Sequence, residues 1–243
     1  GPGEVIAAYD YKDASGKLLF QVCRTADKRF FQRRPDGRGG WVNGLGDVKP
    51  VLYRLPEVLK AVQRGETVFI PEGEKDVDNL ARLGLAATTS PMGAGKWRNH
   101  YSEWLKGANC IILPDNDEPG RKHAEQVARS LHGKAASIKV LELPGLPAKG
   151  DVSDWLAAGG TKEELLKLAT EAPEWEPSEM REKQEKTKKE DERKPTRQTS
   201  FFVNEGTLFE QIYLGGKSLF LAFDTATGET KTMPFIELEE KII

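Results

Sequence analysis

Two short apolar runs, each followed directly by acidic residues, constrain the fold of this chain more than any other feature. Residues 67–71 precede Glu72, and residues 110–114 precede Asp115 and Asp117. Continuous apolar runs of this length are typical of strands that are buried on both faces. Each run is followed by an amphipathic stretch that ends at a glycine. The repeated order of strand, acidic turn and helix predicts an α/β fold with a parallel sheet flanked by helices.

The acidic residues should meet at one edge of this sheet. Ligands of open parallel sheets bind beyond the carboxyl ends of the strands, and Glu72, Asp115 and Asp117 are expected there. Three carboxylates at one point repel each other, so a folded chain tolerates them mainly around a cation. Oxygen ligands favour Mg²⁺ or Mn²⁺. The sequence therefore predicts a metal site formed by these three residues.

The order of the motifs also resembles a known family. The chain contains Glu72-Gly73-x-x-Asp76, then Asp115-x-Asp117-x-x-Gly120-Arg121, then Lys149-Gly150-Asp151-Val152-Ser153-Asp154-Trp155-Leu156. This set resembles the topoisomerase–primase (TOPRIM) domain, and most of all the primase module of phage and plasmid primase–helicases. An isolated DxD motif is weak, whereas the ordered set is specific. The resemblance covers residues 51–172 well and residues 4–53 more loosely.

The resemblance implies roles for the acidic residues. Glu72, Asp115 and Asp117 would be catalytic and would bind Mg²⁺ or Mn²⁺. Asp76 would be a further metal ligand or only an acid on the surface of a helix. Asp151 or Asp154 would complete the site; the sequence does not decide between them, and Asp154 is counted among the candidate metal ligands. Ser153 could instead cap a short helix.

A glycine-rich loop follows the second short strand of this region. Gly93, Gly95 and Lys96 do not form a Walker A loop, because the required Gly and Ser/Thr positions are occupied by Ser90 and Trp97. The loop either holds a phosphate or only caps the next helix. Arg121 either orients phosphates or belongs to a solvated face. The three histidines, His100, His123 and His132, lack metal-ligand spacing and are expected at the surface.

Cations and aromatic residues alternate near the N-terminus. A small antiparallel β region is predicted there, and its candidate nucleic-acid-binding residues are Arg24, Arg29, Arg33 and Arg34. Charges can follow the phosphates of a single strand while rings stack on its bases. The alternative is a polar sheet face with core aromatics, because alternation alone does not assign the faces.

Composition divides the chain into four predicted parts. A β-rich basic subdomain spans residues 4–53, and the catalytic domain spans residues 54–172. Residues 173–199 form a linker that is almost entirely charged in its middle, which predicts a solvated segment. Residues 200–243 regain apolar alternation and predict a β-rich segment, either docked or opening a following domain.

Composition also limits the compartment and the class of protein. The chain has 243 residues and a formal net charge of −2, and no apolar run approaches the ~18 residues of a membrane helix. Cys23 and Cys110 lie in apolar strands, so we expect free buried thiols rather than a disulfide or a four-cysteine zinc site. We therefore expect a cytoplasmic protein without a membrane partner.

The resemblance implies a DNA primase, a nucleotidyltransferase that synthesises RNA primers on single-stranded DNA during replication. Its partners would be the template, nucleoside triphosphates and a replicative helicase domain or protein. Two alternatives remain at this stage. Other TOPRIM proteins are nucleases that cleave phosphodiester bonds with similar acids. The chain could also be a non-catalytic nucleic-acid-binding module that recruits a helicase through residues 200–243.

Overall fold

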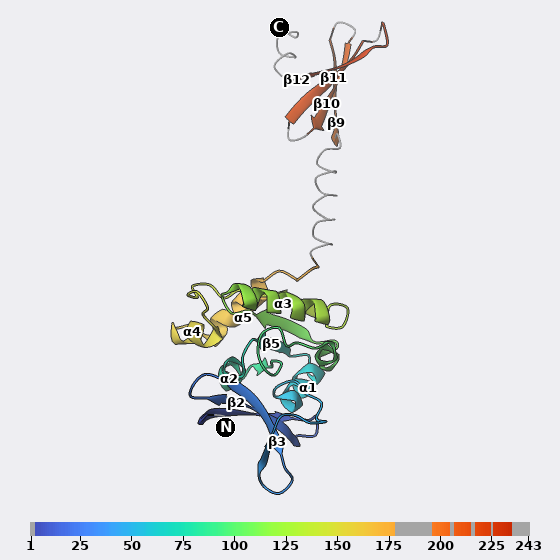
Figure 1. Ribbon diagram of the computed structural model, residues 1–243. Helices are drawn as coiled ribbons and strands as arrows, with labels where there is room; N and C mark the ends of the chain where they lie inside the picture. Colours follow the sequence, from blue (N-terminus) through green and yellow to red (C-terminus); the bar gives the residue numbers. More distant parts are fainter. Residues whose placement is uncertain (1–2, 178–195, 205–206, 215–216, 225, 235–243) are drawn as a thin grey trace. The chain divides into compact units, whose positions relative to one another are not determined.

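The computed structural model describes residues 3–177, 196–204, 207–214, 217–224 and 226–234 (Figure 1). The chain forms two compact units, Gly1–Trp175 and Glu176–Ile243. Most of the predicted linker at residues 173–199 lies outside the described residues. No helix among the described ranges is long and apolar enough to cross a membrane. Cys23 and Cys110 are free and buried, which confirms the prediction for the thiols.

The first unit begins with the predicted antiparallel β region. Its strands are β1 (Val5–Lys12), β2 (Leu18–Thr25), β3 (Phe30–Pro35) and β4 (Trp41–Asn43), in the order β1-β2-β3-β4. The last of these strands, β4, is only three residues long. This short strand pairs with β3 across a turn in which Asp36 Oδ1 accepts from the Arg38 and Gly40 amides.

A parallel four-stranded sheet confirms the predicted α/β fold. Its strands are β5 (Thr67–Pro71), β6 (Ala86–Ala87), β7 (Asn109–Leu113) and β8 (Ser137–Val140), in the order β6-β5-β7-β8. Strands β5 and β7 are adjacent, with Pro71 paired to Leu113 in register. The two acidic turns therefore start from neighbouring strand ends, as the sequence predicted.

Helices flank this sheet (Figure 1). They are α1 (Leu55–Gln63), α2 (Glu74–Arg82), α3 (Glu118–Leu131), α4 (Val152–Ala157) and α5 (Lys162–Glu171), with a 3₁₀ helix η1 (Asn99–Leu105). The stretch from Trp97 to Gly107, where the sequence also predicts a helix, holds η1, which is a 3₁₀ helix and not an α-helix. Arg98 is extended, and the buried Trp97 indole donates to Ser102 Oγ at 3.0 Å, so the chain forms only a short 3₁₀ segment.

One hydrophobic core joins the antiparallel sheet to the parallel sheet. Tyr11 and Phe20 are fully buried and stack with ring centroids 4.5 Å apart. They belong to the same core cluster as Leu55 of α1 and Ile70 of β5. Side chains from β1, β2 and β3 can therefore reach the edge where β5 and β7 end.

The second unit is a four-stranded antiparallel sheet, which confirms the predicted β-rich C-terminal segment. Its strands are β9 (Thr196–Asn204), β10 (Thr207–Leu214), β11 (Lys217–Asp224) and β12 (Thr230–Pro234), in the order β12-β11-β10-β9. Asp224 Oδ1 accepts from the amides of Ala226 and Thr227 in the turn after β11.

Candidate active site

A cavity of about 260 Å³ lies where β5 and β7 end, and we call it the carboxylate cavity. Its walls combine the two acidic turns with the inner face of the N-terminal sheet. Five acidic residues line it: Glu72, Glu74, Asp76, Asp115 and Asp151. Two basic side chains, Lys75 and Arg24, line it as well. The cavity therefore concentrates negative charge at the edge where the sequence predicted a cation site.

Glu72 directly follows β5, and one of its carboxylate oxygens lacks a hydrogen bond among the residues that the structure describes. Within the described part of the chain, Glu72 Oε2 is buried and has no hydrogen-bond partner. Burial is the main cause that raises the Glu72 pKa above its ordinary value, followed by the charges of Asp117 and Asp76. A hydrogen bond from the Ala94 amide opposes this rise. A buried acceptor without a donor is costly, so this oxygen is suited to a cation or an incoming donor.

Asp115 is the most strongly perturbed acid in the cavity. Burial, and then the neighbouring charges of Glu72, Asp76 and other carboxylates, raise its pKa to about 8. Strongly shifted carboxylates that face a cleft are candidates for functional sites. Asp115 and Glu72 are brought together by adjacent strands, as predicted.

Asp117 lies beside the cavity rather than in its wall. It is the N-cap of α3, and its Oδ1 accepts from the Gly120 amide at 2.7 Å. Gly120 explains the spacing of the motif, because a Cβ atom there would lie 2.6 Å from the Asp115 carbonyl oxygen. The helix start can therefore pack directly on the acidic turn only with glycine at this position.

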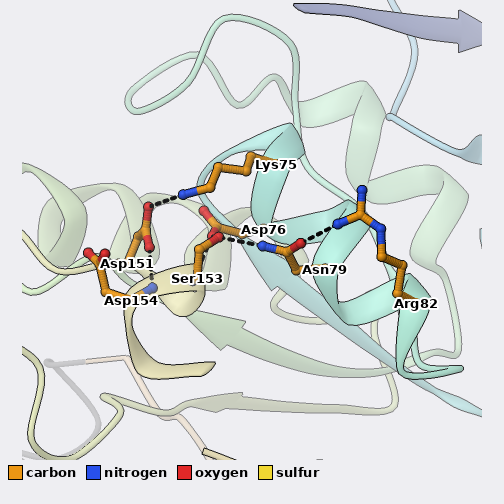
Figure 2. A network of polar contacts seen from close by, with 7 residues as sticks. All are labelled: Lys75, Asp76, Asn79, Arg82, Asp151, Ser153 and Asp154. Carbon is orange, nitrogen blue, oxygen red and sulfur yellow. Dashed lines mark hydrogen bonds and ion pairs between the residues drawn. The ribbon is translucent and has the colours of Figure 1, made fainter. Parts of the chain in front are cut away.

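Asp76 is engaged in a polar network between α2 and α4 (Figure 2). Its Oδ1 accepts from the Ser153 amide at 2.9 Å and from the Ser153 hydroxyl. Asn79 Nδ2 donates to the same hydroxyl at 2.7 Å. Burial raises the Asp76 pKa, and the bonds from Ser153 oppose that rise. In this arrangement Asp76 anchors the start of α4.

The structure assigns Asp151 and Asp154 to different cavities, a choice that the sequence left open. The two residues form a capping box at the start of α4, in which Asp151 is the N-cap. Asp151 lines the carboxylate cavity, whereas Asp154 lines a different cavity beside Trp155. The Asn116 amide donates to the Gly150 carbonyl at 2.9 Å, which holds the Asp151 turn against the Asp115 turn.

The glycine-rich loop borders two cavities. Met92 and Gly93 line the carboxylate cavity, and Met92, Gly95 and Lys96 line a neighbouring cavity of about 390 Å³. Gly93 and Gly95 have φ values of 76° and 72°, a backbone region that glycine adopts readily. The three predicted phosphate-binding residues of this loop are thus divided between the two cavities, and Arg121 lines neither.

His123 was wrongly expected at the surface. It is buried on α3, and its Nδ1 accepts from the Gly95 amide at 3.0 Å. Burial lowers its pKa, so the neutral ring holds the glycine-rich loop. Arg121 lies two residues earlier on α3, where its guanidinium contacts Glu118 at 3.7 Å and Asn116 at 3.5 Å.

The four candidate arginines of the N-terminal sheet do not share one face. Arg24 lines the carboxylate cavity, and its buried Nε has no hydrogen-bond partner among the described residues. Arg33 pairs with Gln21 in the strand register, so alternation places it on the face opposite Arg24. Arg29 forms an exposed ion pair with Asp27 at 2.6 Å, and Arg34 donates to the Gly44 carbonyl at 2.9 Å.

The carboxylates do not form a closed metal cage. Over the described ranges, no group of three or more His, Cys, Asp or Glu side chains is arranged to hold a metal ion. The unsatisfied Glu72 oxygen and the raised pKa of Asp115 nevertheless indicate negative charge that lacks compensation. Such a site fits Mg²⁺, which uses one or two carboxylates together with water and substrate phosphate.

The chain was compared with known protein families and with known proteins. No family model matches the chain. The Gene 57 protein of Mycobacterium phage D29 is 29% identical over 137 residues, which is 56% of this chain and 82% of the phage protein.

Two solved structures share the fold at low sequence identity. The Aquifex aeolicus primase, comprising zinc-binding and RNA polymerase domains, has a TM-score of 0.54 and 21% identity over 69% of this chain and 40% of its own. A DnaG primase catalytic domain bound to single-stranded DNA has a TM-score of 0.50 and 21% identity, over 69% of this chain and 53% of its own. This chain thus spans about half or less of each. The covered part of this chain, 69% of its length, thus has the fold of these primase structures.

Proposed function

We propose that the chain is a DNA primase module that synthesises RNA primers on single-stranded DNA by metal-dependent nucleotidyl transfer. The observation that carries this proposal is the convergence of Glu72 and Asp115, with uncompensated charge, at the end of the parallel sheet. The primase-core fold supports the assignment of that cavity to nucleotide chemistry.

Each acidic residue has a distinct part in this proposal. Glu72, Asp115 and Asp151 would hold Mg²⁺ or Mn²⁺, because they line the cavity. Asp117 would shape the turn as the N-cap of α3, and Asp76 would position α4 through Ser153. When bound, the metal would activate the primer 3′-hydroxyl and neutralise the triphosphate and its leaving group.

The basic groups would position substrates around these acids. Arg24 lines the same cavity as the carboxylates and would contact a phosphate that enters it. The amides of the glycine-rich loop and Lys96 would contact a phosphate in the adjoining cavity. Single-stranded DNA is the proposed template, which the DNA-bound primase domain with the same fold supports. A helicase partner remains part of the proposal on the resemblance alone.

A paired assay tests this function. The full chain is incubated with Mn²⁺, single-stranded DNA and labelled ribonucleotides, and in parallel with supercoiled plasmid. We expect labelled oligoribonucleotides, and we expect Asp115→Ala and Glu72→Gln to abolish them. Asp27→Ala is the matched control, since Asp27 is exposed, lies in the turn between β2 and β3, and does not line the cavity.

The outcomes separate the three functions. Plasmid nicking that depends on Asp115, without primer synthesis, would establish a nuclease instead. DNA binding with neither reaction would establish a binding module. Primer synthesis that survives in both acidic variants would place the active site elsewhere.

A further inference from the structure

Lys75 is a cation placed inside the carboxylate cavity. Its Nζ lies 3.7 Å from Asp151 Oδ2 (Figure 2). Both residues line the same cavity as Glu72 and Asp115. The Lys75 side chain is 54% exposed and that of Asp151 is 26% exposed. The pair is therefore loose and accessible rather than locked in the interior.

The position of Lys75 in helix α2 gives its ammonium freedom to move. Lys75 is the second residue of α2, between the buried residues Glu74 and Asp76. Both neighbours are held by long-range hydrogen bonds, to Tyr11 and Ser153 respectively. The backbone is thus fixed while the four-carbon stem of the lysine can rotate, because lysine is a flexible point charge.

Asp151 cannot serve a metal ion and Lys75 equally well at the same time. A divalent cation near Asp115 and Asp151 would compete with the ammonium for the Asp151 oxygens and would repel it. The Lys75 ammonium would then need another anion within reach. A triphosphate that enters with the metal provides one, and a lysine bonds readily to phosphate as a point charge.

We propose that Lys75 is an exchangeable cation of this site. In the metal-free chain it neutralises Asp151, and on binding of metal and nucleotide it transfers to a phosphate oxygen of the nucleoside triphosphate. Lys75 is thus a substrate-positioning residue. It lowers the affinity for metal when no nucleotide is bound, and it raises the affinity for nucleotide when the metal is bound. The inference rests on the proposed metal-dependent nucleotidyl transfer.

Two binding measurements on the full chain test the exchange. Mn²⁺ binding without nucleotide is measured by electron paramagnetic resonance, and binding of a non-hydrolysable nucleoside triphosphate is measured at saturating Mg²⁺ by calorimetry. The variants are Lys75→Met, Lys75→Arg and Lys60→Met. Lys60 is the matched control, since it is an exposed lysine in helix α1 and does not line the cavity.

The two affinities should move in opposite directions. We expect Lys75→Met to tighten Mn²⁺ binding by roughly threefold, in keeping with a partly exposed ion pair. It should weaken triphosphate binding by roughly fivefold or more, in keeping with a charge-assisted hydrogen bond. Lys75→Arg should retain most triphosphate affinity, and Lys60→Met should change neither affinity.

Other results would overturn the inference. If Lys75→Met weakens both affinities, or behaves like Lys60→Met, Lys75 does not exchange between Asp151 and phosphate. Failure of the proposed function has a different signature. In that case the unaltered chain would bind no Mn²⁺, or would bind it equally after Asp115→Ala, and the inference would fall with it.

Discussion

The hydroxyl of Tyr11 donates a 2.8 Å hydrogen bond to Glu74 Oε1 in the interior of the first unit. This bond joins strand β1 to the first turn of helix α2, 63 residues further along the chain. Tyr11 is fully buried and Glu74 is 5% exposed. The contact therefore fixes the N-terminal sheet against the helix that follows Glu72.

Replacing Tyr11 with phenylalanine should destabilise the first unit. The ring would remain, but a Glu74 oxygen would lose its donor in a buried site. We expect a loss of about 1–3 kcal/mol in the free energy of unfolding, as for other unsatisfied buried acceptors. Urea denaturation measures the loss.

Tyr53→Phe is the matched control for this prediction. The Tyr53 hydroxyl donates to Asp78 at 3.0 Å, and Asp78 also contacts Arg54 at 3.5 Å. Loss of the Tyr53 hydroxyl should therefore reduce the free energy of unfolding by less than loss of the Tyr11 hydroxyl. Equal stability of Tyr11→Phe and the unaltered chain would show that the buried bond does not hold the two layers together.

Two substitutions at Asp76 should separate positioning from metal binding. Asparagine keeps the oxygen that accepts from Ser153, whereas alanine removes it. If Asp76 anchors α4, hydrogen exchange in Val152–Ala157 should rise strongly in Asp76→Ala and little in Asp76→Asn. Mn²⁺ affinity should follow the same order. Equal loss of Mn²⁺ binding in both variants, with α4 still protected, would instead make Asp76 a metal ligand.

The stability of the metal-free chain should fall as the pH rises. The folded pKa of Asp115 is about 8, against an ordinary value of 3.8. The folded state thus retains a proton that the unfolded state releases, and this contribution to stability is lost as the pH rises towards the folded pKa. Burial raises the pKa of Glu72 in the same direction.

Thermal unfolding in a chelator at about pH 6 and about pH 9 measures this effect. We expect a lower melting temperature at the higher pH, a smaller fall in Asp115→Asn, and recovery on addition of Mg²⁺ by mass action. A melting temperature of the Asp115→Asn variant that falls as steeply as that of the unaltered chain would assign the pH dependence to other groups.

The affinity for single-stranded DNA should depend on Arg24 more than on Arg33. Arg24 lines the cavity, whereas Arg33 donates to Gln21 at 2.7 Å and lies over the Trp41 ring at 4.3 Å. Arg24→Ala should weaken binding, more at low salt than at high salt, and lower the salt slope by about 0.7 for one lost phosphate contact.

Fluorescence anisotropy across a salt series measures the two affinities. A larger effect of Arg33→Ala than of Arg24→Ala would place the template on the outer face of the N-terminal sheet. That outcome would make Arg33, another of the candidates named from the sequence, the nucleic-acid contact in place of Arg24.

Local sequence patterns determined the α/β class and the convergence of Glu72 with Asp115. Both follow from short-range information, since a buried parallel strand needs a continuous apolar run and its end must lie at one edge of the sheet. The glycine three residues after Asp117 was also visible in the sequence. Its reason, the 2.6 Å approach to the Asp115 carbonyl, is a tertiary contact.

Long-range packing decided which side chains enter the site. Asp151 and Asp154 belong to one capping box, and only the docking of α4 on Asp76 turns Asp151 towards the cavity. His123 looked like a surface residue because its burial depends on a loop 28 residues away. The sequence could not assign Arg24 and Arg33 to faces, because one-residue differences in strand register reverse every side chain.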